Sequence, residues 1–325
     1  MIFIERVILN AIKHKVEKWF ELERSLEKLE NSNKSIDISP EKSWPDPKKI
    51  PSGNEVPFSL RNIPIVGNHL RSCISEGMKA IKSIAENPDD SNKVIQDHEL
   101  KTFEKEAKQN GIGAISYCKL PPHLIFKERA VLYDYAIVLT MEMDHEAILK
   151  APSLDTFKMV MSTYDILGIT TNKLTSKLRN MGFQAHASHP LGGLTLYPPL
   201  AVEAGLGWFG RHGLLITPEF GARQRLAAIF VNIDNLPISK SNEHSWIEEF
   251  CQNCGKCIKT CPVKAIFSEP IIHESGRKTH IEREQCLPAF VKNEGCTICI
   301  KECAFTQSNY HTLHKNFLIS KDLRS

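Results

Sequence analysis

Two groups of cysteines near the C-terminal end constrain this chain more than any other feature. The segment FCQNCGKCIKTCPVKAI, residues 250–266, contains the first group at spacings of three, three and four residues and places Pro262 after its last member. The second group lies in EQCLPAFVKNEGCTICIKECAF. The two groups consist of Cys251, Cys254, Cys257 and Cys261, and of Cys286, Cys296, Cys299 and Cys303. This density of thiols indicates either disulfides or metal binding, and the cellular setting decides between them.

The composition is typical of a globular protein that is kept in a reducing compartment. The 325 residues are 42% hydrophobic and 24% charged, which is enough to bury a core and to support two domains. A net charge of +3 is too balanced to indicate a nucleic-acid or membrane partner. The N-terminal stretch MIFIERVILNAIKHKVEKWF has no export signature, and no apolar run approaches the roughly 18 residues of a membrane span. We therefore expect a cytoplasmic protein whose clustered cysteines bind metal.

The spacing favours two 4Fe-4S clusters over structural zinc. A CxxCxxC loop brings three thiolates to one cube, while the fourth cysteine of the run reaches the other cube. Zinc favours two CxxC pairs and does not account for a four-cysteine CxxCxxCxxxCP run. The expected ligand sets are Cys251, Cys254, Cys257 and Cys303 for one cluster, and Cys261, Cys286, Cys296 and Cys299 for the other. No proline follows Cys303, which affects local geometry more than ligation.

The rest of the chain predicts three regions. Apolar residues recur every three or four positions from Ile4 to Leu29, which indicates a helix, and residues 31–67 are rich in Pro, Ser and Asn. We expect 1–67 to be an N-terminal helix and an extended irregular arm, 68–240 an α/β (α+β) domain around one sheet, and 241–325 a ferredoxin-like domain with a short tail. The expected strands lie in GAISYCKL, YAIVLTME, FQAHAS, GLLITP and LAAIFVNI.

Glycines and histidines cluster between the sheet and the cysteines. GLGWFG is no dinucleotide fingerprint, because no strand leads directly into it. Gly192 and Gly193 either let backbone approach a flat ligand or make a turn. His186, His189 and His212 are more typical of hydrogen-bonded structural histidines than of ligands, although any of them could line a pocket.

At this point the residues resemble a known family. AVEAGLGWFGRHGLLITPEFGARQRLAAIFVNID, followed by a two-cluster segment, is similar to the core of the corrinoid-dependent reductive dehalogenases and, more distantly, to epoxyqueuosine reductase. The resemblance covers residues 100–305. It implies a nitroreductase-like domain that holds base-off cobalamin without a protein ligand to cobalt, and an external donor (ferredoxin, flavodoxin or reductase) that feeds the clusters. The residues it implies for cofactor contact are Gly192, Gly193, Gly205, Gly207 and Gly210.

The resemblance also suggests a catalytic pair. Tyr164 best matches the proton-donating tyrosine of the dehalogenases, and Arg211 falls where that family has a basic residue beside it. From the residues alone, Tyr164 is better explained as a core tyrosine with its hydroxyl satisfied, and Arg211 could pair with Glu219 at the surface. Chemistry of this kind would reduce a small organic substrate, with organohalides among the candidates.

Two alternatives stay open. The first is an epoxyqueuosine reductase-like enzyme that modifies tRNA, which Trp208 favours, although the acidic residue expected before AGLGW is missing. The second is a non-catalytic protein that transfers electrons or activates a corrinoid partner.

Overall fold

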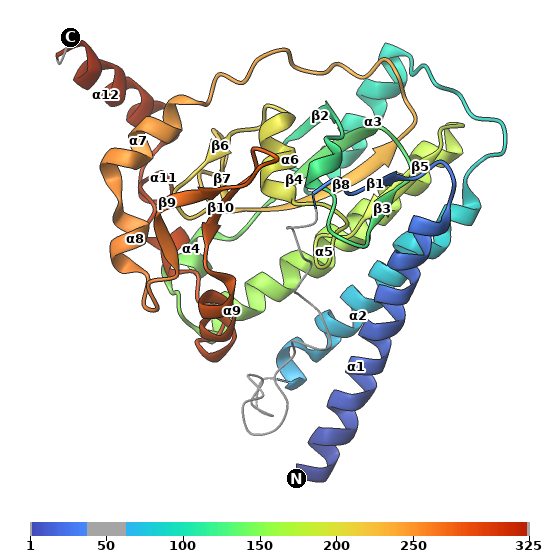
Figure 1. The fold of residues 1–325 in the computed structure, drawn as a ribbon, viewed down its shortest axis with the longest axis horizontal. Helices are drawn as coiled ribbons and strands as arrows, with labels where there is room; N and C mark the ends of the chain where they lie inside the picture. Colours follow the sequence, from blue (N-terminus) through green and yellow to red (C-terminus); the bar gives the residue numbers. More distant parts are fainter. Residues whose placement is uncertain (1, 38–62, 324–325) are drawn as a thin grey trace.

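An antiparallel sheet of four strands forms the centre of the molecule in the computed structural model, which describes residues 2–37 and 63–323 (Figure 1). The strands are β2 (Ile115–Lys119), β4 (Tyr135–Glu142), β8 (Gln224–Val231) and β5 (Ala185–Ser188), and they lie in that order across the sheet. Every neighbouring pair is antiparallel. The expected mixed fold is thus of the α+β type.

Both faces of this sheet are covered, which explains the unbroken apolar run of β4. Successive side chains of a strand point to opposite faces. Ala136 and Val138 pack on one face with α6 (Tyr197–Glu203), and Ile137 and Leu139 on the other with α3 (Asp97–Gln109) and α5 (Leu154–Asn180). The segments expected to form β2, β4, β5 and β8 are confirmed as strands. GLLITP holds only the short strand β7 (Leu215–Ile216), which pairs with β6 (Trp208–Phe209).

The predicted N-terminal helix is confirmed as α1 (Ile2–Ser25), which lies along α2 (Ile63–Lys82) (Figure 1). Trp19 is buried against α2 at Gly77, where a Cβ atom would collide with the indole ring. A buried ion pair between Arg129 Nε and Glu23 Oε2, 2.9 Å long, fixes α1 to the sheet domain.

The predicted irregular arm at 31–67 lies mostly outside the described residues. At the first end of this arm, β1 (Asn33–Lys34) pairs with β3 (Ala130–Val131). At the other end, α2 begins at Ile63, before the domain boundary expected at residue 68. Among the residues that the structure describes before position 240, the remaining short elements are η1 (Leu26–Lys28), η4 (Ser83–Glu86), η5 (Pro122–Leu124) and α4 (His145–Leu149).

The cysteine-rich segment is mostly helical and contains one hairpin. Its elements are α7 (Trp246–Cys254), α8 (Lys256–Thr260), β9 (Ile266–Ile272), β10 (Lys278–Ile281), α9 (Arg283–Lys292), α10 (Ile298–Lys301), α11 (Ala304–Gln307) and α12 (Tyr310–Asp322). The expected short tail forms the helix α12. His314 of this helix stacks on Trp246 of α7, with ring centroids 4.5 Å apart, and so holds the helix against the segment. The end of α12 projects from the body (Figure 1).

One hydrophobic core joins this segment to the sheet domain. Met143, Ile148 and Ile216 of the sheet domain pack with Ile247 and Phe305 of the cysteine-rich segment. Gly221 has a φ of 58° and lies so close to the Phe305 backbone that a Cβ atom would collide with its carbonyl oxygen. The two parts are therefore in close contact at a seam. Among the described helices, none has the length and apolar character needed to cross a membrane.

Candidate functional site

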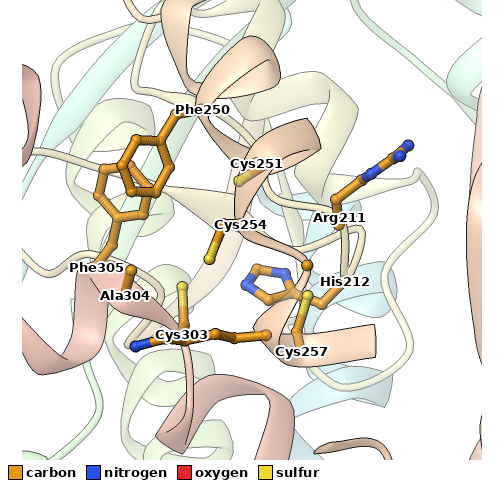
Figure 2. A pocket seen from close by; sticks show the side chains of 11 residues that line it. Arg211, His212, Phe250, Cys251, Cys254, Cys257, Cys303, Ala304 and Phe305 are labelled. Carbon is orange, nitrogen blue, oxygen red and sulfur yellow. The ribbon is translucent and has the colours of Figure 1, made fainter. Parts of the chain in front are cut away.

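The first cysteine pocket is built by both parts of the chain. Its walls include the thiols of Cys251, Cys254, Cys257 and Cys303, and the pocket, which is partly open to solvent, holds about 280 Å³ of empty space (Figure 2). Gly255, with a φ of 58°, ends α7 in the left-handed conformation, so that α8 begins at once and turns Cys257 back toward the same space. Arg211 and His212 reach this pocket from the loop that follows β6.

The second pocket gathers the other four cysteines. Cys261, Cys286, Cys296 and Cys299 line a space of about 390 Å³. The remaining side chains that line it are all apolar and include Val263, Ile281 and Phe290. All of the lining residues belong to the cysteine-rich segment.

The structure thus brings together the same two sets of four cysteines that the sequence predicts to share clusters. Cys303 lies with the first run, and Cys261 lies with the second. Within the described ranges, no three His, Cys, Asp or Glu side chains converge closely enough to hold a single metal ion, so each set surrounds a space. Four thiols around a space fit a 4Fe-4S cube, in which each thiolate binds a different iron atom.

Burial and backbone donors act in opposite directions on these thiols. Burial raises the pKa of Cys251 to about 12, and the backbone N–H of Arg211 acts in the opposite direction on the same pKa. Burial also raises the pKa of Cys257, which the backbone N–H of His212 lowers in part. A thiol that coordinates a metal loses its proton outright. The loop after β6 therefore supplies N–H groups where thiolate charge would form.

His212 itself is buried in this pocket. Its Nδ1 accepts a hydrogen bond of 3.1 Å from the backbone N–H of Leu214. Burial, with a smaller contribution from His280, lowers the pKa of His212 to about 4. The ring is therefore neutral at physiological pH.

Arg211 is not beside Tyr164, which corrects the expected pairing. Its guanidinium donates hydrogen bonds of 2.7 and 3.0 Å to the carboxylate of Glu269 on β9. Figure 2 shows this guanidinium pointing away from the cysteine sulfurs. The partner is also not Glu219. Arg211 instead ties the loop after β6 to the hairpin of the cysteine-rich segment.

A different arginine lies against Tyr164. The Arg225 guanidinium carbon is 3.8 Å from the centroid of the Tyr164 ring, and Arg225 Nη2 is 3.2 Å from Met143 Sδ. The alternation of β8 could have identified Arg225, since Ala227 and Ile229 face α5 and Arg225 shares their parity. Among the described residues, none accepts a hydrogen bond from the Tyr164 hydroxyl or donates one to it.

The glycines expected to contact cobalamin are explained by close packing and turns. A Cβ atom at Gly193 would collide with the Tyr197 hydroxyl, and one at Gly207 would collide with the carbonyl oxygen of Ile216. A Cβ atom at Gly210 would lie 2.5 Å from the His212 ring. Gly192 and Gly205 have φ values of 84° and 74° and form turns. Packing and turn geometry thus account for these glycines, and their contact with a corrin stays a prediction.

Tyr197, the other tyrosine near the glycine-rich segment, is held in the core. Its hydroxyl donates to the carbonyl oxygens of Ser188 and His189, at 2.8 and 2.9 Å. Burial raises its pKa well above the ordinary value. Tyr197 is therefore a poorer candidate for proton donation than Tyr164.

Sequence comparison connects both parts of the chain to proteins of known activity. Residues 244–267 match the family model described as a 4Fe-4S binding domain. A tetrachloroethene reductive dehalogenase of Desulfitobacterium hafniense is 30% identical over 214 residues, which cover 61% of this chain and 37% of that protein. The enzyme of the same name from Sulfurospirillum multivorans is 33% identical over 186 residues, covering 54% of this chain and 36% of the relative. An epoxyqueuosine reductase of Synechocystis is 31% identical over 117 residues, or 33% of this chain and 38% of that protein.

The fold has solved counterparts. A catabolic reductive dehalogenase in complex with 3-bromo-4-hydroxybenzoic acid superimposes with a TM-score of 0.61 at 18% identity, over 76% of this chain and 39% of that one. A reductive dehalogenase whose structure is described as suggesting a mechanism for B12-dependent dehalogenation matches with a TM-score of 0.61 at 17% identity, over 76% of this chain and 38% of the other. The chain thus has the fold of part of these proteins. Its alignment covers only 37% of the length of the Desulfitobacterium hafniense enzyme.

Proposed function

We propose that this chain, which belongs with the reductive dehalogenases and is related to epoxyqueuosine reductase, is an iron-sulfur oxidoreductase that passes electrons through two 4Fe-4S clusters to a small organic substrate. One observation carries the proposal: two cysteine runs far apart in the sequence exchange members to surround two separate pockets. Such an exchange brings two cubes close together, as electron transfer requires.

The protein's own contribution to electron transfer is to hold and shield the clusters. When bound, each cube supplies a site that gains and loses one electron. The four thiolates of each pocket would fix a cube, and the apolar walls of the second pocket would keep water away from it. An external donor such as a ferredoxin or flavodoxin would supply the electrons. We expect no nucleic-acid partner, because the net charge of +3 is small for this length.

Tyr164 is the proposed proton donor to the reduced substrate. Its hydroxyl has no hydrogen-bond partner within the described part of the chain, while the Arg225 guanidinium 3.8 Å from the ring centroid fixes the ring. A phenol with a free hydroxyl beside a cation can transfer a proton to a group that has gained electrons. The proposed pair is therefore Tyr164 with Arg225, and Arg211 belongs to the cluster side.

Cobalamin binding rests on the relatives alone. One solved relative is described in terms of B12-dependent dehalogenation. In this chain, protein atoms occupy the Cβ positions of Gly193, Gly207 and Gly210, so packing alone accounts for these three glycines. The electron and proton roles proposed above do not depend on that cofactor.

Anaerobic purification tests the cluster proposal directly. We expect about eight iron atoms and eight sulfides per chain, because each cube holds four of each. Electron paramagnetic resonance (EPR) of the reduced protein should show two interacting 4Fe-4S centres. Stoichiometric zinc without iron would contradict the proposal. Supplementing the preparation with cobalamin, followed by gel filtration and absorption spectroscopy, tests corrin binding separately.

A non-catalytic electron carrier is the second candidate. The composition of the two pockets favours it, since both sets of four cysteines are assembled without Tyr164 or Arg225 in their linings. Turnover assays separate the two functions. The reduced protein, with and without cobalamin, would be given a panel of halogenated phenols and an RNA that contains epoxyqueuosine. Product formation supports an enzyme, and cluster oxidation only by a partner protein supports a carrier.

A further inference from the structure

His212 is placed inside the first pocket in a way that its structural contacts do not explain. Its side chain is 1% exposed, and its ring lies in the same pocket as the sulfurs of Cys254, Cys257 and Cys303 (Figure 2). Gly210 is required beside it, because a Cβ atom there would come within 2.9 Å of His212 Nε2. The loop is thus shaped to admit an imidazole at this point.

The hydrogen bonds of His212 define which nitrogen carries the proton. Nδ1 accepts from the backbone N–H of Leu214 and so carries no proton of its own. In a neutral imidazole the proton is then on Nε2. Nε2 is fully buried and has no hydrogen-bond partner among the described residues. A buried N–H without an acceptor is costly and rare, so an acceptor is expected in the pocket.

We propose that His212 donates its Nε2–H to a sulfur of the cluster held by Cys251, Cys254, Cys257 and Cys303, and thereby raises the reduction potential of that cluster. Cluster sulfurs are anionic acceptors, and the bond strengthens when the cluster gains an electron, which favours the reduced state. The inference rests on the proposed function only in requiring that the clusters bind. His212 acts through the cluster and is a positioning residue.

The second pocket provides the internal contrast. Its lining contains no histidine and no other polar side chain besides the cysteines, among the residues that the structure describes. Backbone donors do not distinguish the two pockets, because the Ala265 N–H donates to Cys261 Sγ at 3.3 Å and the charge of Arg283 acts on Cys286. The imidazole of His212 is what the first pocket has and the second lacks. Removing the imidazole donor should therefore shift the potential of the first cluster and leave the second unchanged.

Two substitutions at His212 separate the hydrogen bond from the shape of the side chain. His212→Met removes the donor at similar volume, and His212→Gln keeps an N–H at the end of the side chain. In EPR-monitored redox titrations of the full chain with dithionite, His212→Met should lower the reduced-to-oxidised ratio of the first cluster about threefold to tenfold at fixed solution potential. For a one-electron couple this is a shift of roughly 30 to 60 mV to more negative potential. His212→Gln should recover most of it, and the second cluster should not move.

His280 offers a matched control. It is a half-buried imidazole that packs against Gly213 of the same loop, but it lines neither pocket. His280→Met should leave both potentials unchanged. Equal shifts in His212→Met and His280→Met would overturn the proposal, because they would reflect general loosening of the loop.

A measurement on the unchanged protein covers the case in which His212→Met loses its cluster. With ¹⁵N-labelled histidine, pulsed EPR of the reduced wild-type protein should show a ¹⁵N hyperfine coupling on the first cluster and none on the second. Absence of that coupling in a protein that contains about eight iron atoms would overturn the histidine proposal and leave the proposed function intact. A protein without iron would overturn both, so the two failures are distinguishable.

Discussion

The two cysteine pockets have the same kind of ligands and different walls. The first is closed jointly by the cysteine-rich segment and by the loop after β6, which brings Arg211 and His212. The second is closed by residues of the cysteine-rich segment and, apart from the cysteines, has apolar walls. Two equivalent sets of thiols thus stand in different surroundings, and we expect those surroundings to make the two proposed clusters behave differently.

Substituting a ligand cysteine should have the largest effect. It also tests whether the two sets of four cysteines are assigned to the correct clusters. Cys303→Ser should remove the first cluster, although Cys303 is the last cysteine of the second group in the sequence, and Cys299→Ser should remove the second cluster. Iron content should fall from about eight to about four atoms in each variant. EPR identifies which centre survives. Loss of the second cluster in Cys303→Ser would show that the ligand sets are crossed.

Tyr164→Phe should have the next largest effect and should spare both pockets. The variant retains the ring against Arg225 and removes only the hydroxyl, so turnover of a reducible substrate should fall about 10²- to 10⁴-fold. Iron content and both potentials should match the wild type, because Tyr164 lines neither pocket. Tyr197→Phe is the control for a buried hydroxyl. Undiminished turnover in Tyr164→Phe would exclude this residue as the proton donor.

His186 sharpens the comparison, because it is a buried imidazole outside both pockets. Burial, with a smaller contribution from the Arg179 charge, lowers its pKa from 6.5 to about 3. The unfolded chain takes up a proton as the pH falls through 6.5, and the folded chain does not until about pH 3. Protonation therefore favours the unfolded state between these values, and the loss should reach about 2 kcal/mol at pH 5.

The measurement is urea unfolding followed by tryptophan fluorescence at pH 8 and pH 5. In the wild type, the free energy of unfolding should fall between pH 8 and pH 5. In His186→Leu this fall should be smaller by about 2 kcal/mol. Its iron content should be unchanged at pH 8. An identical pH dependence in both proteins would show that His186 is solvated or paired in the folded state.

Removing the Arg211–Glu269 ion pair should have the smallest effect. Glu269 is exposed, and exposed pairs contribute little to stability. Glu269→Gln should leave iron content and unfolding close to wild type, and the first cluster should keep its potential because the backbone N–H groups and His212 stay in place. A large drop in that potential would show that the ion pair, more than the loop itself, controls the first pocket.

The sequence predicts the cysteine sets well because their spacing reflects a local requirement. A CxxCxxC loop can converge on one cube with few other contacts, so four residues in Cys251–Cys261 suffice to indicate it. The strand β4 is equally predictable, since apolar side chains on both faces leave few other arrangements. The helix α1 follows from its period.

The partners of Tyr164 and Arg211 could not be predicted in the same way. Arg211 and Tyr164 are placed by long-range packing of the loop after β6 and of α5, which no local pattern encodes. The glycines were ambiguous for a related reason, because a residue kept small for a ligand and one kept small for Tyr197 or Ile216 look the same in sequence. The role of His212 depends on the Leu214 amide and on the pocket, which only the structure brings together.

The close contact of Gly221 with the Phe305 backbone limits how interchangeable the two parts are. Redox enzymes often borrow a separate, diffusing ferredoxin, and a fused one can in principle be cut off or replaced. Here the cut would expose the shared core around Ile216 and Phe305 and would remove the loop wall of the first pocket. Cys303 and His212 would be on opposite pieces. The cysteine-rich segment is therefore not a separable domain. A chimera with another ferredoxin module would have to exchange the loop after β6 together with the segment.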